Sequence, residues 1–185
     1  MASDAPLPIH TIGHSTRPLL ELVALLRGRG ITRLIDVRTV PKSRHNPQYN
    51  SEALATALPG HGIAYHPMPT LGGLRHPRPD SANLGWRNAS FRGFADYMQT
   101  AAFEAALGKL RAIAVNEPTA IMCAEAVPWR CHRSLIADTL VVRQLEVRHI
   151  IGPSEAKLHV LTPFAKVVGT SVTYPPEAPD LFLRG

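Results

Sequence analysis

The chain has 185 residues, of which 45% are hydrophobic and 18% charged, and this balance excludes a disordered protein and suits a single domain over residues 1–185. Lys and Arg outnumber Asp and Glu by 20 to 14, and only four of the basic residues are lysines, so arginine supplies almost the whole excess. Arginine favours bidentate contacts with phosphate or carboxylate groups, although a coding bias that replaces surface Lys by Arg gives the same composition.

No stretch approaches the roughly 18 apolar residues of a membrane-spanning helix, and the N-terminal residues lack the basic and apolar regions of a secretory signal. We therefore expect a cytoplasmic protein without a membrane partner. Cys123 and Cys131 are the two cysteines of the chain. In a reducing compartment, two cysteines at this spacing are free thiols or metal ligands rather than a structural disulfide.

Strand and helix patterns alternate from the start of the chain. Residues 8–15 read as a short strand, and residues 17–30 carry apolar side chains at helical spacing. Pro18 suits the first turn of this helix. Residues 31–38 read as a second strand, and a strand–helix–strand unit has a right-handed crossover between parallel strands. We therefore expect a largely parallel sheet.

The middle of the chain combines a third strand with a long loop. A modest helical pattern over 51–60 precedes the strand predicted at 63–69. Residues 70–93 are rich in glycine and proline, and loops of this length are typically functional or disordered. Disordered segments are poor in aromatic residues, whereas this one contains Trp86 and Phe91 among its arginines. We expect an ordered lid or binding loop.

The second half continues the alternation. The pattern predicts a helix over 94–115 with a break near Thr100, a strand over 118–123, a helix over 132–145 and a strand over 147–152. The tail at 157–176 alternates β-branched residues and is predicted to be extended or a hairpin. Together these elements predict an α/β fold with a mostly parallel sheet of about five strands, flanking helices and a long Arg-rich loop.

Polar residues follow three of the predicted strands. Parallel strands bring their carboxyl ends to one edge of the sheet, which is the usual ligand position in open α/β folds. The residues expected there are His14 and Ser15, Asp36 and Arg38, and Cys123 and Glu125, while Cys131, His132 and Arg133 open the following helix. A convergent set of this kind predicts one common pocket.

Several segments also resemble a known family. They are TIGHS, LIDVRTVPKSRHNPQYN, LGGLR, WRNASFRGFADYM, MCAEAVPWRCHRSLIAD and the tail segment LTPFAKVVGTSVTYP. In this order they are similar to the family catalogued as domain of unknown function 488, over about residues 8–175. The resemblance implies a compact α/β domain of bacterial or archaeal type and no particular activity. The polar motif positions of the family are matched by His14, Ser15, Asp36, Arg38, Pro41, Arg44, Cys123, Glu125, Cys131, His132 and Arg133.

The candidate site is suited first to a small anionic ligand that carries a phosphate or carboxylate group. Its candidate catalytic residues are Cys123, Cys131, His14 and Glu125, and its candidate ligand-binding residues are Ser15, Asp36, Arg38, Arg44, Trp86, Arg87, Arg92, His132 and Arg133. A cysteine at a helix N-terminus near arginines has a lowered pKa and attacks electrophiles. Cys131 is predicted to have this position, whereas Cys123 leaves a buried strand and should react more slowly. His14 or His132 would carry the proton.

Two other chemistries stay open. Cys123, Cys131, His132 and His14 offer the nitrogen and sulfur ligands that zinc prefers. The spacing C-x7-C-H is uncommon for zinc, and adjacent residues in a helix point about 100° apart, so no metal ligand is assigned. Alternatively, the Arg-rich loop would bind nucleic acid, with Trp86 and Phe91 stacking on bases. The net charge of +6 permits such binding without establishing it.

The sequence favours the first of these chemistries. We expect a small anionic ligand at the carboxyl edge of the sheet. The residue pattern alone leaves open whether the protein is an enzyme, which cofactor it uses and which oligomeric state it has.

Overall fold

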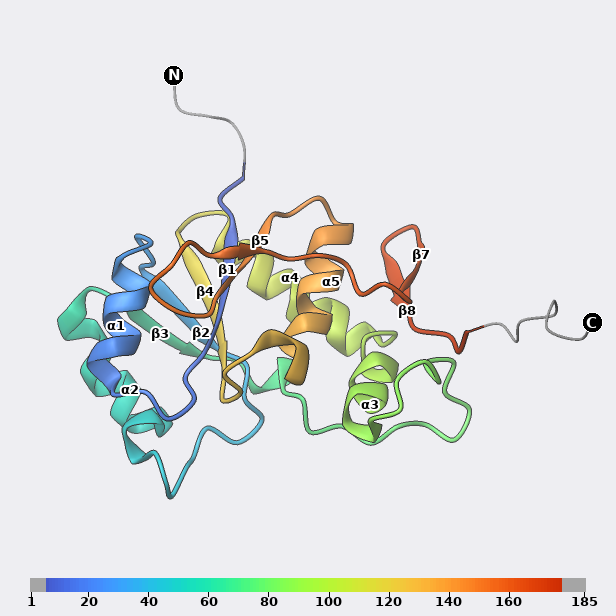
Figure 1. Ribbon diagram of the computed structural model, residues 1–185, viewed down its shortest axis with the longest axis horizontal. Helices are drawn as coiled ribbons and strands as arrows, with labels where there is room; N and C mark the ends of the chain where they lie inside the picture. The colour runs from blue at the N-terminus through green and yellow to red at the C-terminus, as the bar shows by residue number, and fades with distance from the viewer. Residues whose placement is uncertain (1–5, 178–185) are drawn as a thin grey trace, which may run out of the picture.

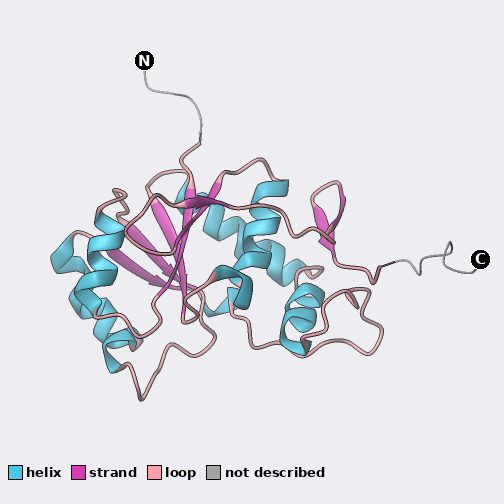
Figure 2. Ribbon diagram, viewed as in Figure 1, coloured by secondary structure: helices cyan, strands magenta, loops and turns pink. Residues whose placement is uncertain are grey.

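The computed structural model describes residues 6–177 and is built around one six-stranded sheet (Figures 1 and 2). The strands are β1 Ile9–Gly13, β2 Arg33–Asp36, β3 Ala64–Pro67, β4 Thr119–Cys123, β5 Val147–Ile150 and β6 Lys157–Leu158, in the spatial order β3-β2-β4-β1-β5-β6. The first five are parallel to one another, and the two-residue β6 pairs antiparallel with β5 at one edge. The predicted α/β fold with a mostly parallel sheet is confirmed.

Helices cover both faces of the sheet. They are α1 Leu19–Arg27, α2 Ser51–Ala57, α3 Ala89–Tyr97, α4 Ala101–Ala114 and α5 Arg133–Val142, with short 3-10 turns at Pro47–Tyr49, Leu58–His61, Pro69–Leu71 and Pro128–Arg130. In Figure 1, α1 and α2 lie on one side of the sheet, and α4 and α5 lie on the other, with α3 beyond them. None of the helices within residues 6–177 is long and apolar enough to cross a bilayer.

The helical pattern over 94–115 breaks where the sequence predicts. Helix α3 ends at Tyr97, and α4 begins after Thr100, whose side-chain oxygen accepts a hydrogen bond from the backbone N–H of Phe103. Thr is a favourable N-cap because its hydroxyl satisfies one of the N–H groups that a helix start leaves without a partner. The two helices can therefore take different directions across the same face.

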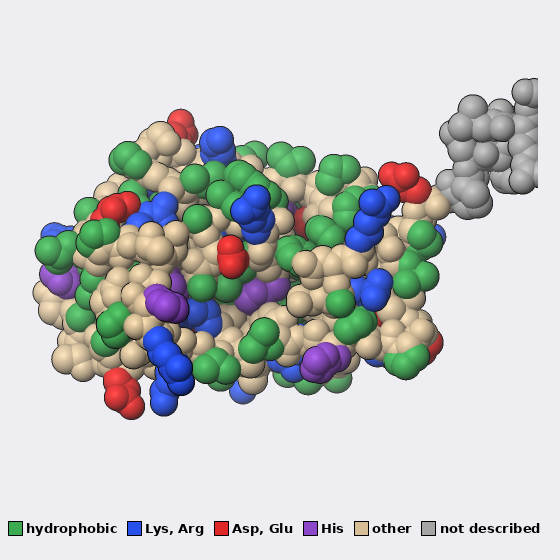
Figure 3. Space-filling model, turned by 60° about the horizontal axis from the view of Figure 1, so that its bottom comes forward, with side chains coloured by type: hydrophobic (Ala, Val, Ile, Leu, Met, Phe, Trp, Pro, Cys, Tyr) green, Lys and Arg blue, Asp and Glu red, His purple; other side chains and the backbone are tan. Residues whose placement is uncertain are grey.

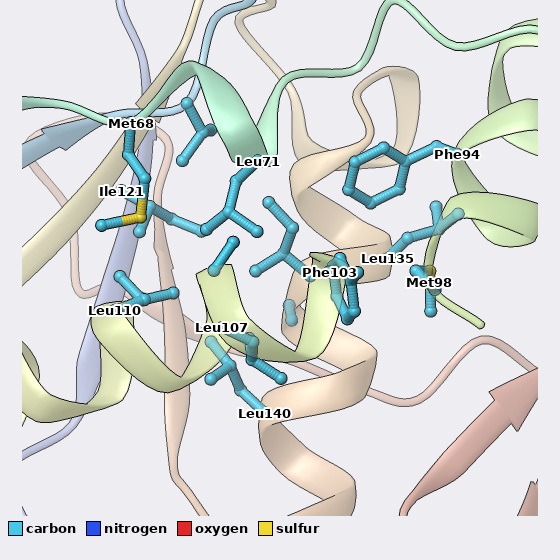
Figure 4. Close-up of a cluster of buried hydrophobic side chains, with 14 of the residues drawn as sticks. Met68, Leu71, Phe94, Met98, Phe103, Leu107, Leu110, Ile121, Leu135 and Leu140 are labelled. Atoms are coloured by element: carbon cyan, nitrogen blue, oxygen red, sulfur yellow. The ribbon is translucent and has the colours of Figure 1, made fainter. Parts of the chain in front are cut away.

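Alternation along the strands divides the core into two layers. Ile35, Ile121 and Cys123 point towards α3, α4 and α5, whereas Leu34 and Met122 point towards α1 and α2. Figure 4 shows the first layer, in which leucines of α4 and α5 pack against the sheet and the 3-10 turn Pro69–Leu71. This parity decides on which side of the sheet each polar residue at a strand end will lie.

The tail after β5 is held against α5 by hydrogen bonds to one buried carboxylate, that of Asp138 in α5. Asp138 accepts hydrogen bonds from the His159 ring at 2.7 Å, from the backbone N–H of Thr162 at 3.0 Å and from the Tyr174 hydroxyl at 2.7 Å. The tail also forms the hairpin β7 Lys166–Val168 and β8 Ser171–Thr173. The predicted extended tail is thus an ordered part of the fold.

The carboxyl ends of β1, β2 and β4 meet at one edge, which lies at the bottom of the sheet in Figure 1. Gly13 pairs with Cys123, and the ladder continues beyond the strands through His14 N–H to Cys123 O at 3.0 Å and Ser15 N–H to Ala124 O at 2.9 Å. Glu125 then passes so close to Gly13 that a Cβ atom on the glycine would lie 1.7 Å from its carbonyl oxygen. Only glycine fits at this position.

We predict that Gly13→Ala lowers the free energy of unfolding by about 3 kcal/mol, the upper end of the usual cost of overpacking, because the new methyl group displaces backbone rather than a movable side chain. Chemical denaturation of the variant and the parent measures this difference. Gly108→Ala is the matched control. Gly108 is exposed in α4 with nothing within 4 Å of the added Cβ, so this change should stabilise by about 0.5–1 kcal/mol. Equal stability of the two variants would contradict the close approach at Gly13.

Candidate functional site

The connection between β4 and α5 positions both thiols. Cys123 ends β4, the chain then turns through Pro128–Arg130, and α5 begins at Arg133. The Arg133 side chain is buried, and its guanidinium donates hydrogen bonds to the carbonyl oxygens of Glu125 at 2.6 Å and Ala126 at 3.1 Å. The guanidinium therefore folds the connection back over the start of α5, which brings Cys131 beside Cys123.

Cys123, Cys131 and His132 form a compact cluster at the end of this connection. Their sulfur atoms and the His132 Nδ1 all lie within 4.8 Å of one another. The Nδ1 atom is 3.6 Å from Cys131 Sγ and 4.0 Å from Cys123 Sγ. The opposite ring nitrogen, Nε2, donates a hydrogen bond to the carbonyl oxygen of Val37 at 3.1 Å, and the Phe94 ring packs against the imidazole. These two contacts fix the direction of Nδ1 towards the thiols.

The two thiols differ in acidity because they share a hydrogen bond. The Cys131 thiol donates to Cys123 and holds the pKa of Cys123 well below the usual range; His132 and the Arg133 charge act in the same direction and, with Cys131, outweigh burial. Burial raises the pKa of Cys131 well above its usual range, and the neighbouring Cys123 sulfur raises it further. Cys123 is therefore the more acidic thiol of the pair.

This order reverses the sequence-based expectation that Cys131 is the more acidic thiol. Cys131 precedes α5 in extended backbone and is buried, so its proximity to a helix start does not compensate for lost solvation.

The backbone of Cys131 also allows Cys131 and His132 to face one metal ion, which the sequence-based prediction of a shared helix did not. The separation of about 100° applies to neighbours within a helix, whereas Cys131 has φ −138° and ψ 143° and His132 has φ −56° and ψ −17°.

A pocket of about 330 Å³ opens beside the cluster, and we call it the thiol pocket. It is lined by Arg38, Thr39, Val40, Gly73, Leu74, Ser90, Phe91, Cys123, Ala124, Glu125, Arg130, Cys131 and His132. Arg130 is exposed and forms no ion pair with any residue in the described range 6–177. The long loop before α3 supplies one wall of this pocket through Gly73 and Leu74.

A second pocket of about 390 Å³ lies on the other side of the connection, and we call it the His14 pocket. His14, Ser15 and Lys42 line it. It shares four lining residues with the thiol pocket: Arg38, Val40, Ala124 and Glu125. The predicted common pocket is therefore divided into two adjoining pockets, and Asp36 and Arg133 line neither of them. Strand parity separates the two pockets, because His14 and Asp36 lie on the α1 and α2 side of the sheet whereas Cys123 lies on the other.

Arg38 is held by a buried network between the two pockets. Its guanidinium forms an ion pair with Asp36 and donates to the Tyr49 carbonyl oxygen at 2.7 Å, and its Nη1 is 3.2 Å from His14 Nε2. His14 accepts this bond, so its other nitrogen donates to the Ser15 carbonyl oxygen at 2.7 Å. Burial lowers the pKa of His14 and keeps the ring neutral. The charge of Arg38 is thus largely compensated by Asp36.

The other candidate ligand-binding residues lie outside both pockets. Trp86 packs on Phe91, Phe164 and Tyr174, against the tail rather than beside the thiols. Arg92 donates to the Trp86 carbonyl oxygen at 3.4 Å, and Arg44 and Arg87 line neither pocket. Arg133, as described, binds backbone. The structure therefore brings together the cysteines, Glu125, Arg38 and His132 in the thiol pocket. His14 and Ser15 line the adjoining His14 pocket.

Arg130 and Gly73 are pocket residues that were not among the candidates predicted from the sequence. Arg130 directly precedes Cys131, so its position in the sequence was a usable signal. Gly73 lies against the His132 ring, where a Cβ atom would be 2.4 Å from Nδ1. Adjacent glycines in a loop often mark such a close approach, but the partner is 59 positions away and becomes visible only in the fold.

Fold and site together define an α/β protein with a buried thiol and imidazole cluster at the carboxyl edge of its sheet. The sequence profile of the family described as "Domain of unknown function DUF488" matches residues 18–140, and the chain belongs to this family. The comparisons found no matching curated protein and no matching solved structure.

We predict that Cys123 is alkylated before Cys131 in reduced, chelator-treated protein, because the thiolate is the reactive form and Cys123 has the lower pKa. The rate at Cys123 should reach its plateau below the pH of about 8.5 at which an ordinary thiol is half ionised. Iodoacetamide labelling followed by peptide mass spectrometry measures both, since trypsin cleaves after Arg130 and separates the two cysteines. Faster labelling of Cys131 would contradict the assigned order.

Proposed function

We propose that this protein binds a small anionic ligand in the thiol pocket, next to Cys123. The proposal is carried by one observation: a guanidinium without an ion-pair partner in the described chain, that of Arg130, lines the same pocket as a buried, acidic thiol. A guanidinium presents a rigid fork of donors that matches phosphate and carboxylate oxygens. Ligands with such a group are therefore the chemical class that the pocket fits.

The size of the pocket supports a small ligand. Its volume of about 330 Å³ is near the lower end of the range of about 300–1,000 Å³ for ligand sites. Phe91 and Leu74 give it apolar walls, and Ser90 adds a hydroxyl. A pocket with a few polar groups on apolar walls orients a small molecule rather than an extended polymer.

The nucleic-acid alternative has weaker support. Arg78 forms an ion pair with Asp80, and Arg75 donates to the carbonyl oxygens of Gly72 and Thr70, so two loop arginines already have partners. On the face drawn in Figure 3, basic side chains are interspersed with hydrophobic and acidic ones. A polyanion binds best to a continuous basic surface.

The charge selectivity of alkylation tests the proposal. Iodoacetate is an anion and iodoacetamide is neutral, and both attack the same thiolate, so the ratio of their rates at Cys123 reports attraction of anions into the pocket. We predict that Arg130→Gln lowers the ratio of the iodoacetate rate to the iodoacetamide rate by up to about fivefold, since ion pairs of exposed groups contribute up to ~1 kcal/mol. Mass spectrometry of reduced, chelator-treated protein measures each rate.

Arg87→Gln is the matched control, because it removes the same charge from a residue that lines neither pocket. It should leave the ratio unchanged. Added inorganic phosphate should slow iodoacetate more than iodoacetamide in the parent protein. An equal ratio in the parent and in Arg130→Gln would overturn the proposed anion site.

A further inference from the structure

We infer that Cys123, Cys131 and His132 bind a zinc ion whose fourth coordination position opens into the thiol pocket. This deepens the proposed function, and it rests on that function only for the identity of the group that occupies the open position. The metal site itself follows from the cluster.

The distances in the cluster suit tetrahedral zinc. Zinc lies about 2.3 Å from thiolate sulfur and about 2.0–2.1 Å from imidazole nitrogen, so ligand atoms at tetrahedral angles are about 3.5–3.8 Å apart. Nδ1 of His132 lies 3.6 Å and 4.0 Å from the two sulfurs. All three ligand atoms are within 4.8 Å of one another, so adjustments of ångström size or less bring them onto one ion.

The orientation of His132 is that of a metal ligand. Histidines that bind a metal through one nitrogen usually donate the other N–H to a carbonyl or carboxylate, which sets the tautomer and aims the lone pair. His132 donates Nε2–H to the Val37 carbonyl oxygen at 3.1 Å. In the neutral ring the lone pair therefore lies on Nδ1, which faces both sulfurs.

Gly73 allows the loop backbone to pack directly against the imidazole of His132. A Cβ atom at Gly73 would lie 2.4 Å from Nδ1, closer than any real contact of this kind. A side chain at this position would therefore displace the imidazole and turn Nδ1 away from the two sulfurs. Since Gly73, Cys123, Cys131 and His132 all line the thiol pocket, an ion among them would face that pocket.

The donor set selects the metal. Two thiolates and one imidazole favour zinc over magnesium or calcium, which prefer oxygen ligands. Three protein ligands with one open position are typical of sites where zinc holds a water or a ligand, whereas structural sites use four protein ligands. His14 does not supply a fourth ligand, because both of its ring nitrogens have hydrogen-bond partners.

Titration with zinc alone tests this site. Reduced protein, purified without a metal-affinity column and stripped by chelator, is titrated with Zn²⁺ against a chromophoric chelator. We expect one Zn²⁺ per chain, and Cys123→Ser, Cys131→Ser and His132→Gln should each lower the affinity more than the roughly 10–100-fold typical of losing an outer-shell partner. Gly73→Ala should weaken binding without removing a ligand. His76→Gln is the matched control, since it removes an exposed histidine outside the cluster.

Cobalt binding to the parent protein gives a readout that needs no variant. One equivalent of Co²⁺ should produce the strong visible bands of tetrahedral cobalt together with thiolate charge transfer, and saturating Zn²⁺ should protect both cysteines from iodoacetamide. The inference is overturned if Zn²⁺ binds the parent no more tightly than it binds Cys123→Ser, or if both thiols are alkylated at the metal-free rate in saturating Zn²⁺. Anion selectivity is measured without metal, so either proposal can fail alone.

Discussion

The close passage of the Glu125 backbone over Gly13 is the constraint on which the carboxyl edge depends. Because no side chain intervenes, the β1–β4 ladder extends to Ala124 before the chain turns away. The buried guanidinium of Arg133 then holds the Glu125 and Ala126 carbonyl oxygens from the other side. A charged group buried in this way is stable only with such partners. Together the two contacts set the path that returns Cys131 to Cys123.

This path also separates the polar residues into a structural network on one side of the sheet and a group available for binding on the other. On the α1 and α2 side, Asp36, Arg38 and His14 use most of their polar atoms on one another and on backbone, so they stiffen the edge of the sheet. On the other side, His132 Nδ1 lies 3.6 Å and 4.0 Å from the two sulfurs, and the Arg133 backbone N–H donates to Cys131 Sγ at 3.5 Å. These distances are longer than ordinary hydrogen bonds between nitrogen and oxygen. The chemically available groups are therefore in the thiol pocket.

The fold was largely predictable because hydrophobic periodicity is local: the five parallel strands and the helix break at Thr100 follow from neighbouring residues. The strand ends also predicted which edge carries the polar groups. The division into two pockets was not predictable, since it depends on which face each strand turns to the helices. Trp86 illustrates the same limit, because its partners Phe164 and Tyr174 come from the tail. The thiol acidities depend on a hydrogen bond between residues that the sequence shows only as eight positions apart.

In the proposed site, one zinc ion and its ligand meet at the two thiols and His132. X-ray absorption at the zinc edge of the loaded protein examines this site without any substitution, because the spectrum reports the atoms bound to the metal. We expect two sulfur neighbours at about 2.3 Å and one imidazole nitrogen at about 2.0–2.1 Å, plus one nitrogen or oxygen atom that exchanges when phosphate is added. A coordination shell made only of nitrogen and oxygen would show that the thiols do not bind the metal.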